Sequence, residues 1–397
     1  MKRFGNFFII ACFALCAVVS GCEKGENDDD GGGGNGKGKV WVDKKGGKTQ
    51  TYANLDAALL PLMQSGPGEY TIRIGENQHI TSNFNYFAQK EQTITLKAES
   101  GTVEITRSSD LSHHFWVQLE STLILEKGIT LKGYGYDDEG YPDTFDEGIW
   151  VDRKGKLIMN EGVKLTGFGH AAIFISNGIF EMNGGTICDN VQWGVDSDNE
   201  WEGSVFIMNG GSISDNGVAG NATGVHIGSA TFTMNNGTIS GNATGGVMVY
   251  PGGTFIMKNG RIINNRVEYY GSSGGGVDVL RGTFTMEGGE ISGNKATYGG
   301  GVSVVEGTFT MTGGIIAKNT ATSLGGGIEL DKSSIFSKTG NSIIYGVNGG
   351  TNANISEGDG HAAYISGTYP TVKRDLTAGE GVVMRWSENG SKVGWDN

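Results

Sequence analysis

Length, glycine content and charge limit what this chain can be. It has 397 residues, of which 70 are glycine and 37% are hydrophobic, and its formal net charge is -13 at pH 7. The glycines lack a collagen period, and the hydrophobic fraction is large enough for a packed core. An acidic surface repels nucleic acid and anionic membranes, so we expect no nucleic-acid partner.

Residues 1–21 have the pattern of a signal peptide. Lys2 and Arg3 precede an apolar stretch, residues 7–19, that is too short to span a bilayer. The stretch is followed by Cys22, and Val19-Ser20-Gly21-Cys22 resembles the bacterial lipoprotein signal, in which the cysteine is lipidated. This resemblance implies that Cys22 anchors the protein to a membrane. The alternative is an ordinary secretory signal that contains a cysteine by chance.

Residues 22–39 contain almost no apolar side chains, which predicts a disordered tether. Its acidic run, Asp28 to Asp30, resembles the export signal of cell-surface lipoproteins in some bacterial groups. The resemblance implies an outer-membrane lipoprotein exposed on the cell surface. The alternative interpretation is a soluble spacer.

Residues 40–110 are predicted to hold an N-terminal cap and the first turns of the fold described below. Apolar residues at positions 55, 58, 59, 62 and 63 follow a helical spacing, with Asn54 as the N-cap residue. We expect this short helix to cover the open end of a stack of strands, where unpaired strand edges need protection.

One phrase recurs six times in the middle of the chain. Its copies are GIFEMNGGTICDN from Gly178, SVFIMNGGSISDN from Ser204, ATFTMNNGTISGN from Ala230, GTFIMKNGRIINN from Gly253, GTFTMEGGEISGN from Gly282 and GTFTMTGGIIAKN from Gly307. A period between 20 and 50 residues indicates a solenoid, a propeller or another repeat array. The period varies here, which a coil accommodates as bulges at its corners, whereas a propeller needs longer blades of nearly constant length.

Each period contains three short strand patterns separated by glycine-rich turns. In the repeat from Gly276, alternation places an apolar set on the inner face. That set is Val277, Val279, Phe284, Met286 and Ile291. The sequence therefore predicts an all-β, parallel β-helix with three strands per turn and about nine or ten turns, roughly 45 Å long. Residues 111–344 form its repeats and residues 345–397 a C-terminal cap.

Stacking of equivalent residues predicts two columns, one inside the coil and one at its corners. The first is a phenylalanine column, Phe180, Phe206, Phe232, Phe255, Phe284 and Phe309. The second is an asparagine column, Asn190, Asn216, Asn242, Asn265, Asn294 and Asn319. Stacked amides can bond to one another and to turn backbone, so we interpret the asparagine column as a structural ladder.

These repeats resemble those of bacterial right-handed β-helix proteins of the pectin lyase-like superfamily, specifically surface lipoproteins that carry repeated GTFTMxGGxISGN phrases. The similarity covers the predicted cap, the repeats and the closing stretch from Ile343 to Gly379. It implies a right-handed, single-stranded parallel β-helix and an envelope location. Most members that carry this phrase have no established activity, so the resemblance implies no reaction.

Enzymes built on this coil, such as pectate lyases and polygalacturonases, carry characteristic polar patterns. The Asn-Thr-Asp, Gly-His-Gly and Arg-Ile-Lys patterns of polygalacturonases do not occur, and Gly169-His170 and Gly360-His361 are each followed by alanine. We therefore assign no catalytic residue. The alternative is a polysaccharide lyase or hydrolase that acts at a face containing Trp150, Asp196 and His226.

The first strand of each turn is predicted to show an outer face of mixed character. Its residues are Trp150, Phe174, Asp196, His226, Met248, Asp278, Ser303 and Glu329. Two insertions, residues 134–147 and 192–202, add carboxylates and aromatic side chains beside it. Tryptophan and tyrosine next to carboxylates suit sugar rings and their hydroxyls. The candidate ligand-binding residues are Trp150, Phe174, Trp193, Asp196, Asp198, Trp201, His226 and Tyr250.

No cofactor is expected, although the dense carboxylates of the insertions could supply oxygen ligands to calcium. The leading functional hypothesis is a lipid-anchored, non-catalytic protein that binds a polysaccharide or another cell-surface polymer, as an adhesin does. The other interpretation of the same loops is that they are solvated and that their aromatic residues fold onto the coil. In that case the protein would be a passive structural coat or spacer.

Overall fold

The computed structural model shows a parallel β-helix of about ten turns, which confirms the fold class expected from the repeats. The described residues are 40–82, 85–87, 89–136, 146–197, 203–217, 222–267, 271–358, 360–365, 372–374, 384–385 and 394–395. Cys22, with the predicted signal peptide and tether, lies outside them. Within the described residues, no helix is long and apolar enough to cross a membrane.

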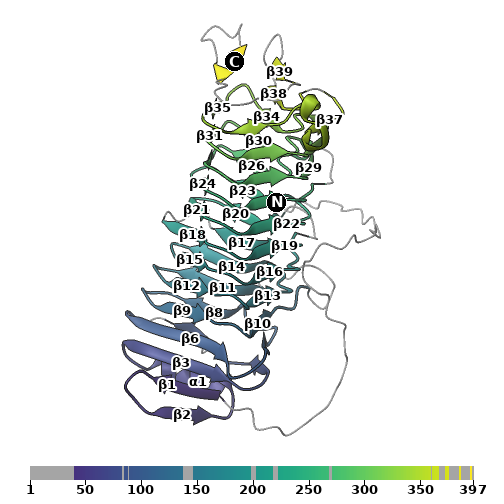
Figure 1. The fold of residues 1–397 in the computed structure, drawn as a ribbon. Helices are drawn as coiled ribbons and strands as arrows, with labels where there is room; N and C mark the ends of the chain where they lie inside the picture. The colour runs from purple at the N-terminus through teal and green to yellow at the C-terminus, as the bar shows by residue number, and fades with distance from the viewer. Residues whose placement is uncertain are drawn as a thin grey trace, which may run out of the picture.

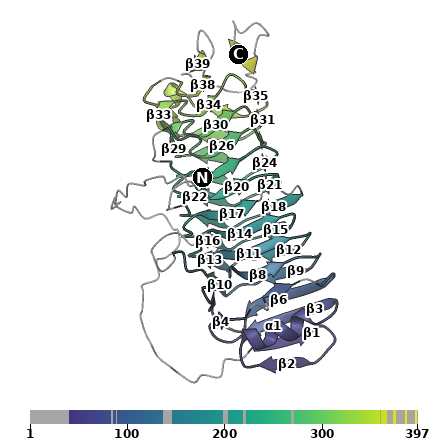
Figure 2. The same ribbon diagram turned by 180° about the vertical axis from the view of Figure 1, so that it is seen from behind.

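Three sheets, here named A, B and C, form the walls of one elongated coil (Figures 1 and 2). Sheet A runs β2 (Thr49–Tyr52), β1 (Val40–Lys44), β3 (Gly68–Ile74), β6 (Gln92–Ala98), β9 (Thr122–Leu125), β12 (Lys156–Met159), β15 (Ile179–Met182), β18 (Ser204–Met208), β21 (Ala230–Met234), β24 (Thr254–Met257), β27 (Thr283–Met286), β31 (Thr308–Met311) and β35 (Ile335–Lys338). From β3 onward all neighbours in this sheet pair in parallel.

Sheets B and C complete each turn. Sheet B runs β4 (Gln78–Ile80), β7 (Val103–Arg107), β10 (Ile129–Lys132), β13 (Lys164–Thr166), β16 (Thr186–Cys188), β19 (Ser212–Ser214), β22 (Thr238–Ser240), β25 (Arg261–Ile263), β28 (Glu290–Ser292), β32 (Ile315–Ala317) and β36 (Ile343–Ile344). Sheet C runs β5 (Tyr86–Phe87), β8 (His113–Val117), β11 (Glu147–Asp152), β14 (Ala171–Ser176), β17 (Trp193–Ser197), β20 (Val225–Ile227), β23 (Val247–Val249), β26 (Val277–Leu280), β30 (Val302–Val305), β34 (Ile328–Leu330), β38 (Ala363–Ile365) and the antiparallel β39 (Val372–Arg374).

The phenylalanine column forms as the repeats predict. Each ring of the six predicted phenylalanines stacks on the next, with centroids 4.4–4.9 Å apart and planes within 5–8° of parallel. All six side chains are buried. Beside them, the glycines of the repeated phrase leave room for the buried methionine that the same phrase carries in the preceding turn. At Gly211, where φ is +85°, a Cβ atom would lie 2.6 Å from the terminal methyl group of Met182.

The asparagine column forms a hydrogen-bonded ladder, as predicted. In its middle, Asn242 Oδ1 accepts the backbone N–H of Asn216 at 3.0 Å and the side-chain amide of Asn216 at 2.9 Å. Asn242 Nδ2 in turn donates to Asn265 Oδ1 at 2.8 Å and to the carbonyl of Ile213 at 3.3 Å. Every asparagine in the column is fully buried, and Asn354 adds one further rung beyond Asn319. The ladder thus satisfies buried turn backbone that no sheet can reach.

The predicted helix caps the N-terminal end, and a hairpin joins it. The Asn54 side chain accepts the N–H of Ala57, and the buried face of α1 (Leu55–Met63) belongs to the same core as the coil. Strands β1 and β2 pair antiparallel and cover the free edge of β3. The sequence analysis did not identify this hairpin, although Val40-Trp41-Val42 alternates before a Gly-Gly turn.

The C-terminal turns contain a fourth strand that the repeats do not predict. β29 (Lys295–Tyr298), β33 (Thr320–Leu324) and β37 (Ile355–Ser356) pair in parallel directly after the asparagine corner. The 3-10 helix η1 (Val347–Asn352) precedes the last of these strands, and β40 (Met384–Arg385) pairs with β41 (Gly394–Trp395) near the end of the chain. Sheet C continues in register through β38, so the coil extends past residue 345.

Replacing Asn242 with alanine should lower the free energy of unfolding by about 3 kcal/mol, because two buried donors and two buried acceptors lose their partner. Asn235→Ala is the matched control, since Asn235 donates to Asn209 at 2.8 Å in an exposed amide row. That variant should stay within about 0.5 kcal/mol of the native protein. Urea unfolding followed by far-UV circular dichroism measures both. Equal effects would contradict a stabilising role for the buried ladder.

Candidate functional site

The outer face of sheet C carries the residues predicted for it, one per turn and in register. The pairing connects Trp150 to Phe174, Phe174 to Asp196, and Asp196 to His226. The same column continues through Met248, Asp278, Ser303 and Glu329. It also begins two turns earlier than predicted, because Trp116 pairs with Trp150 and Tyr86 pairs with Trp116.

The aromatic side chains of this face form an unbroken series of ring contacts, here called the aromatic strip. Its members are Trp116, Trp150, Phe174, His170, Trp193, His226 and Tyr250. The two tryptophans Trp116 and Trp150 stack with centroids 4.9 Å apart and planes 13° from parallel. The later contacts are edge-on or tilted, at 4.8–6.0 Å. From β8 to β23 the strip crosses five strand intervals, about 24 Å.

Five predicted binding residues of the strip and one neighbour therefore lie together. The five are Trp150, Phe174, Trp193, His226 and Tyr250, and the neighbour is Asp196, which contacts His226. Asp198 and Trp201 lie outside the described residues. The sequence analysis missed Trp116 and His170. The alternation of His113 to Val117 would have revealed Trp116 if the repeat register had been carried one turn upstream.

Two histidines of the strip are held by carboxylates. His226 Nδ1 lies 2.5 Å from Asp196 Oδ1, and both side chains are nearly buried. His170 Nδ1 lies 3.3 Å from Glu147 Oε1. Burial lowers the pKa of His170, but the Glu147 carboxylate outweighs it, so the pKa lies above its ordinary value. Each carboxylate orients an imidazole ring edge-on or tilted among the aromatic rings.

Among the described residues, three polar atoms of the strip are buried without a partner: the donors Nε1 of Trp116 and Nε1 of Trp150, and Nε2 of His226. Nδ1 of His170 is also buried and forms no hydrogen bond of good geometry, although it faces Glu147. Because Nδ1 of His226 faces a carboxylate, the ring favours the tautomer in which Nε2 is the acceptor. Buried polar groups are almost always satisfied in native structures, so these atoms mark positions where a bound molecule would complete the hydrogen bonding.

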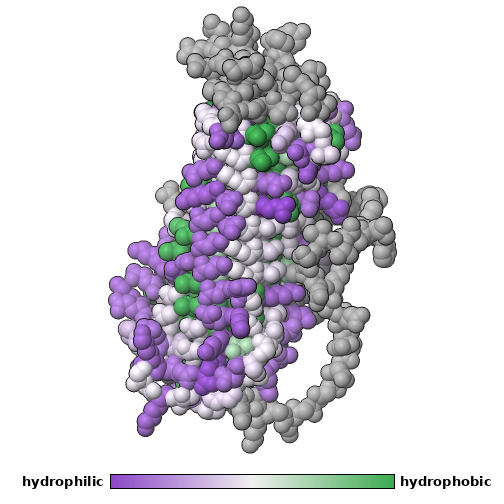
Figure 3. Space-filling view, in the orientation of Figure 1, coloured by the Kyte–Doolittle hydropathy of each residue, from purple (hydrophilic) through white to green (hydrophobic). Residues whose placement is uncertain are grey.

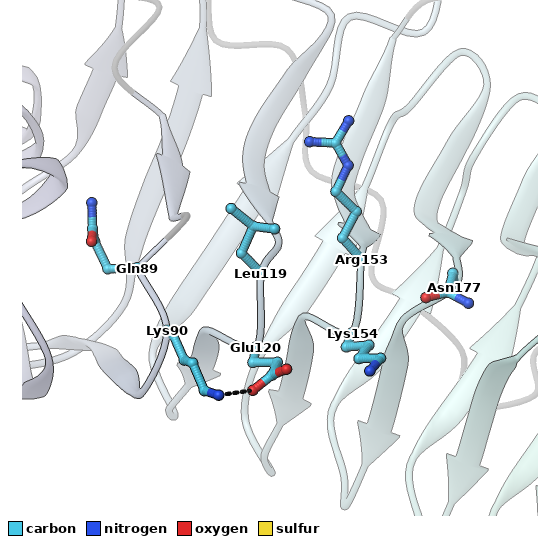
Figure 4. Close-up of a pocket in the computed structure, with 7 residues that line it drawn as sticks. All are labelled: Gln89, Lys90, Leu119, Glu120, Arg153, Lys154 and Asn177. Carbon is cyan, nitrogen blue, oxygen red and sulfur yellow. Dashed lines mark ion pairs between the residues drawn. The ribbon is translucent and has the colours of Figure 1, made fainter.

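A groove of about 650 Å³ runs along the corner between sheets C and A (Figure 4). It is lined by Gln89, Lys90, Leu119, Glu120, Arg153, Lys154 and Asn177. The Arg153 guanidinium lies 6.0 Å from the Trp116 ring centre, so the groove adjoins the strip. The groove is not strongly basic, because Lys90 pairs with Glu120 at 3.3 Å and Arg153 with Asp152 at 3.4 Å.

The far end of the outer column differs from the prediction. Asp278, Ser303 and Glu329 are not an open face, since Ser303 is fully buried and Glu329 is 7% exposed. A glycine four residues upstream folds over each of them, and a Cβ atom at Gly274 would lie 2.5 Å from Asp278 Cβ. These glycine arches hydrogen-bond to one another through Gly275 and Gly299. Every ring of the aromatic strip except His226 is partly exposed, so the strip is the accessible part of the face.

The insertion beside the strip is held by a buried ion pair. Asp146 Oδ1 pairs with the Arg107 guanidinium at 2.5 Å, and neither side chain is exposed. The other carboxylate oxygen, Oδ2, accepts the N–H groups of Tyr134, Gly135 and Gly169 at 2.8–2.9 Å. Both ends of the insertion are thereby attached to the coil next to Phe168 and His170. Most of its predicted calcium-binding carboxylates lie in residues 137–145, outside the described residues.

In the described part of the chain, no three histidine, cysteine, aspartate or glutamate side chains are grouped to hold a metal ion. The surface in Figure 3 shows apolar side chains only in scattered groups, near the left edge and toward the upper end. Searches of protein-family models, curated proteins and solved structures return no match to this chain.

Burial raises the pKa of Asp278 to about 7. An unfolded aspartate ionises near pH 4, so as pH rises the unfolded chain loses this proton before the folded one does. The contribution of Asp278 to the free energy of unfolding therefore falls as pH rises from about 4 to about 7. Asp278→Asn should become more stable relative to the native protein as pH rises through this window. Urea midpoints of both proteins at several pH values measure the effect; a pH-independent difference would contradict it.

Proposed function

We propose that the protein is a lipid-anchored, cell-surface β-helix protein that binds a glycan along the aromatic strip without cleaving it. One observation carries this proposal: seven aromatic or imidazole rings contact one another over about 24 Å of a half-buried face. A ligand that covers this length is extended, and sugar rings present the flat C–H faces and hydroxyls that such rings and polar atoms bind.

The polar atoms of the strip support a carbohydrate over a purely apolar ligand. The unpartnered Nε1 of Trp150 can donate to a hydroxyl, and the unpartnered Nε2 of His226 can accept from one. Their burial excludes water from these positions and makes a missing partner costly. A hydroxylated ring that displaces the side chains covering these atoms would satisfy both, whereas a hydrocarbon chain would satisfy neither.

The cellular location of the protein is part of the proposal. The lipoprotein-like signal at Cys22 and the polar tether after it support attachment to the outer membrane with the coil directed outward. The three-sheet coil and its buried asparagine ladder support membership of the pectin lyase-like superfamily. Labelling of intact cells with an antibody against the coil tests the orientation, because a periplasmic protein would stay unlabelled.

A second candidate function, polysaccharide cleavage, is favoured by the Asp196 and His226 pair. A carboxylate at 2.5 Å from Nδ1 orients the imidazole so that Nε2 can accept a proton from a bound substrate. A lyase or hydrolase would release shorter chains from the polymer that the strip binds. Chromatography of the polymer after incubation with the protein decides between the two functions, since a binding protein leaves the chain length unchanged.

Trp150→Ala should weaken glycan binding at least about tenfold, or about 1.4 kcal/mol, because it removes the stacked pair and an unpartnered donor together. The matched control is Trp41→Ala, since Trp41 lies in β1 at the N-terminal end and packs beneath Arg73. A glycan array probed with the full-length protein in detergent identifies the ligand, and calorimetry measures the variants. Equal losses in both variants, or no array signal, would contradict the proposal.

A further inference from the structure

The outer face of sheet A carries mostly threonine side chains over four successive strands. Strands β21, β24, β27 and β31 each present two outward side chains, and seven of the eight are threonine. We call this set the threonine face. Its residues are Thr231, Thr233, Thr254, Ile256, Thr283, Thr285, Thr308 and Thr310. All eight are partly exposed, and the sheet runs along one side of the coil in Figures 1 and 2.

The threonine face is a regular two-dimensional array. One column pairs Thr231, Thr254, Thr283 and Thr308 in register, and the second column lies two residues along each strand. Neighbouring rungs are about 4.8 Å apart, and the two columns are about 6.6 Å apart. Directly beneath, phenylalanine rings stack within 5–8° of parallel. This stacking holds the rungs in line where most sheets would twist.

The array is uncharged and its hydroxyls have no partner within the described residues. None of the seven threonine hydroxyls forms a hydrogen bond to another described residue. The next rungs are also free of charge, with Val205 and Ile207 on one side and Ile335 and Ser337 on the other. The first outward charge toward the N-terminus is Glu181, which pairs with Lys156 at 2.9 Å. In a chain with 73 charged residues, 30 basic plus 43 acidic, six neutral rungs are unusual.

Neither a second copy of the chain nor an apolar partner suits this face. Six rungs and two columns cover only a few hundred Å², whereas a stable protein interface needs about 800 Å² from each partner. A dry interface would also bury threonine hydroxyls without partners, which costs free energy at each rung. A suitable partner is flat and extended, and it offers hydrogen-bonding groups at a fixed repeat with room for methyl groups between them.

Crystalline water has these properties. We propose that the threonine face adsorbs to ice. Water oxygens on the prism planes of ice repeat in two dimensions at spacings close to those of the threonine array. Each hydroxyl can bond to a surface water, while the threonine and isoleucine methyl groups sit in the hollows between waters. Adsorption of this kind needs no cofactor and no covalent step, and it is independent of glycan binding on sheet C.

The test measures ice binding by the full-length protein in detergent, with detergent alone as the blank. We expect the labelled protein to be incorporated into a slowly growing ice hemisphere and to inhibit ice recrystallisation. Thr283→Lys, which places a charge at the centre of the array, should reduce inhibition at least tenfold. Thr238→Lys is the matched control, because Thr238 is an equally partly exposed outward residue in β22 of sheet B. It should keep native activity.

Two further comparisons define what would overturn the proposal. Thr283→Val keeps the shape and loses the hydroxyl, so it should retain only part of the activity, and Trp150→Ala should retain all of it. Exclusion of the native protein from ice, or equal losses in the two lysine variants while both remain folded by circular dichroism, would refute ice binding. A dimer that Thr283→Lys dissociates in sedimentation would instead assign the threonine face to a second copy, which also refutes it.

Discussion

The stacking of each turn directly on the one before is the constraint on which the rest of the structure depends. Core phenylalanines meet ring over ring at 4.4–4.9 Å, and buried asparagines donate and accept along the same axis. Both columns require the same spacing, which is also the spacing of hydrogen-bonded parallel strands. Because three independent interactions share one repeat, a shift of register in any turn would break all of them at once.

That shared register converts a repeated sequence into ordered surfaces. On sheet C, it places residues of six successive turns, from Trp116 to Tyr250, in one row of ring contacts. On sheet A, the same register aligns threonines from four turns in two straight columns. The two surfaces differ in chemistry because outward positions do not affect the core and can therefore vary from face to face. A coil of this kind can carry more than one binding surface.

The segments that depart from the repeat supply what stacking of turns cannot, namely end caps and an anchor for the insertion. The ends need caps, which α1 and the β1–β2 hairpin provide at the N-terminal end. The insertion at residues 134–147 needs an anchor, which the buried pair of Arg107 and Asp146 provides. Toward the C-terminal end, glycine arches close over Asp278, Ser303 and Glu329, and Ser303 and Glu329 become part of the interior.

The sequence by itself determined the coil, its three strands per turn and the two columns of stacked residues, because each depends on a local pattern repeated at a fixed period. It also determined the capping helix, because the apolar residues there follow a helical spacing. It also placed Trp150, Phe174, Asp196 and His226 on one face, since register follows from the repeat. Only the tertiary structure decided that His170 and Trp116 complete the aromatic strip and that Gly274 covers Asp278. These contacts join insertions and degenerate turns, whose paths depend on packing rather than on any periodic signal.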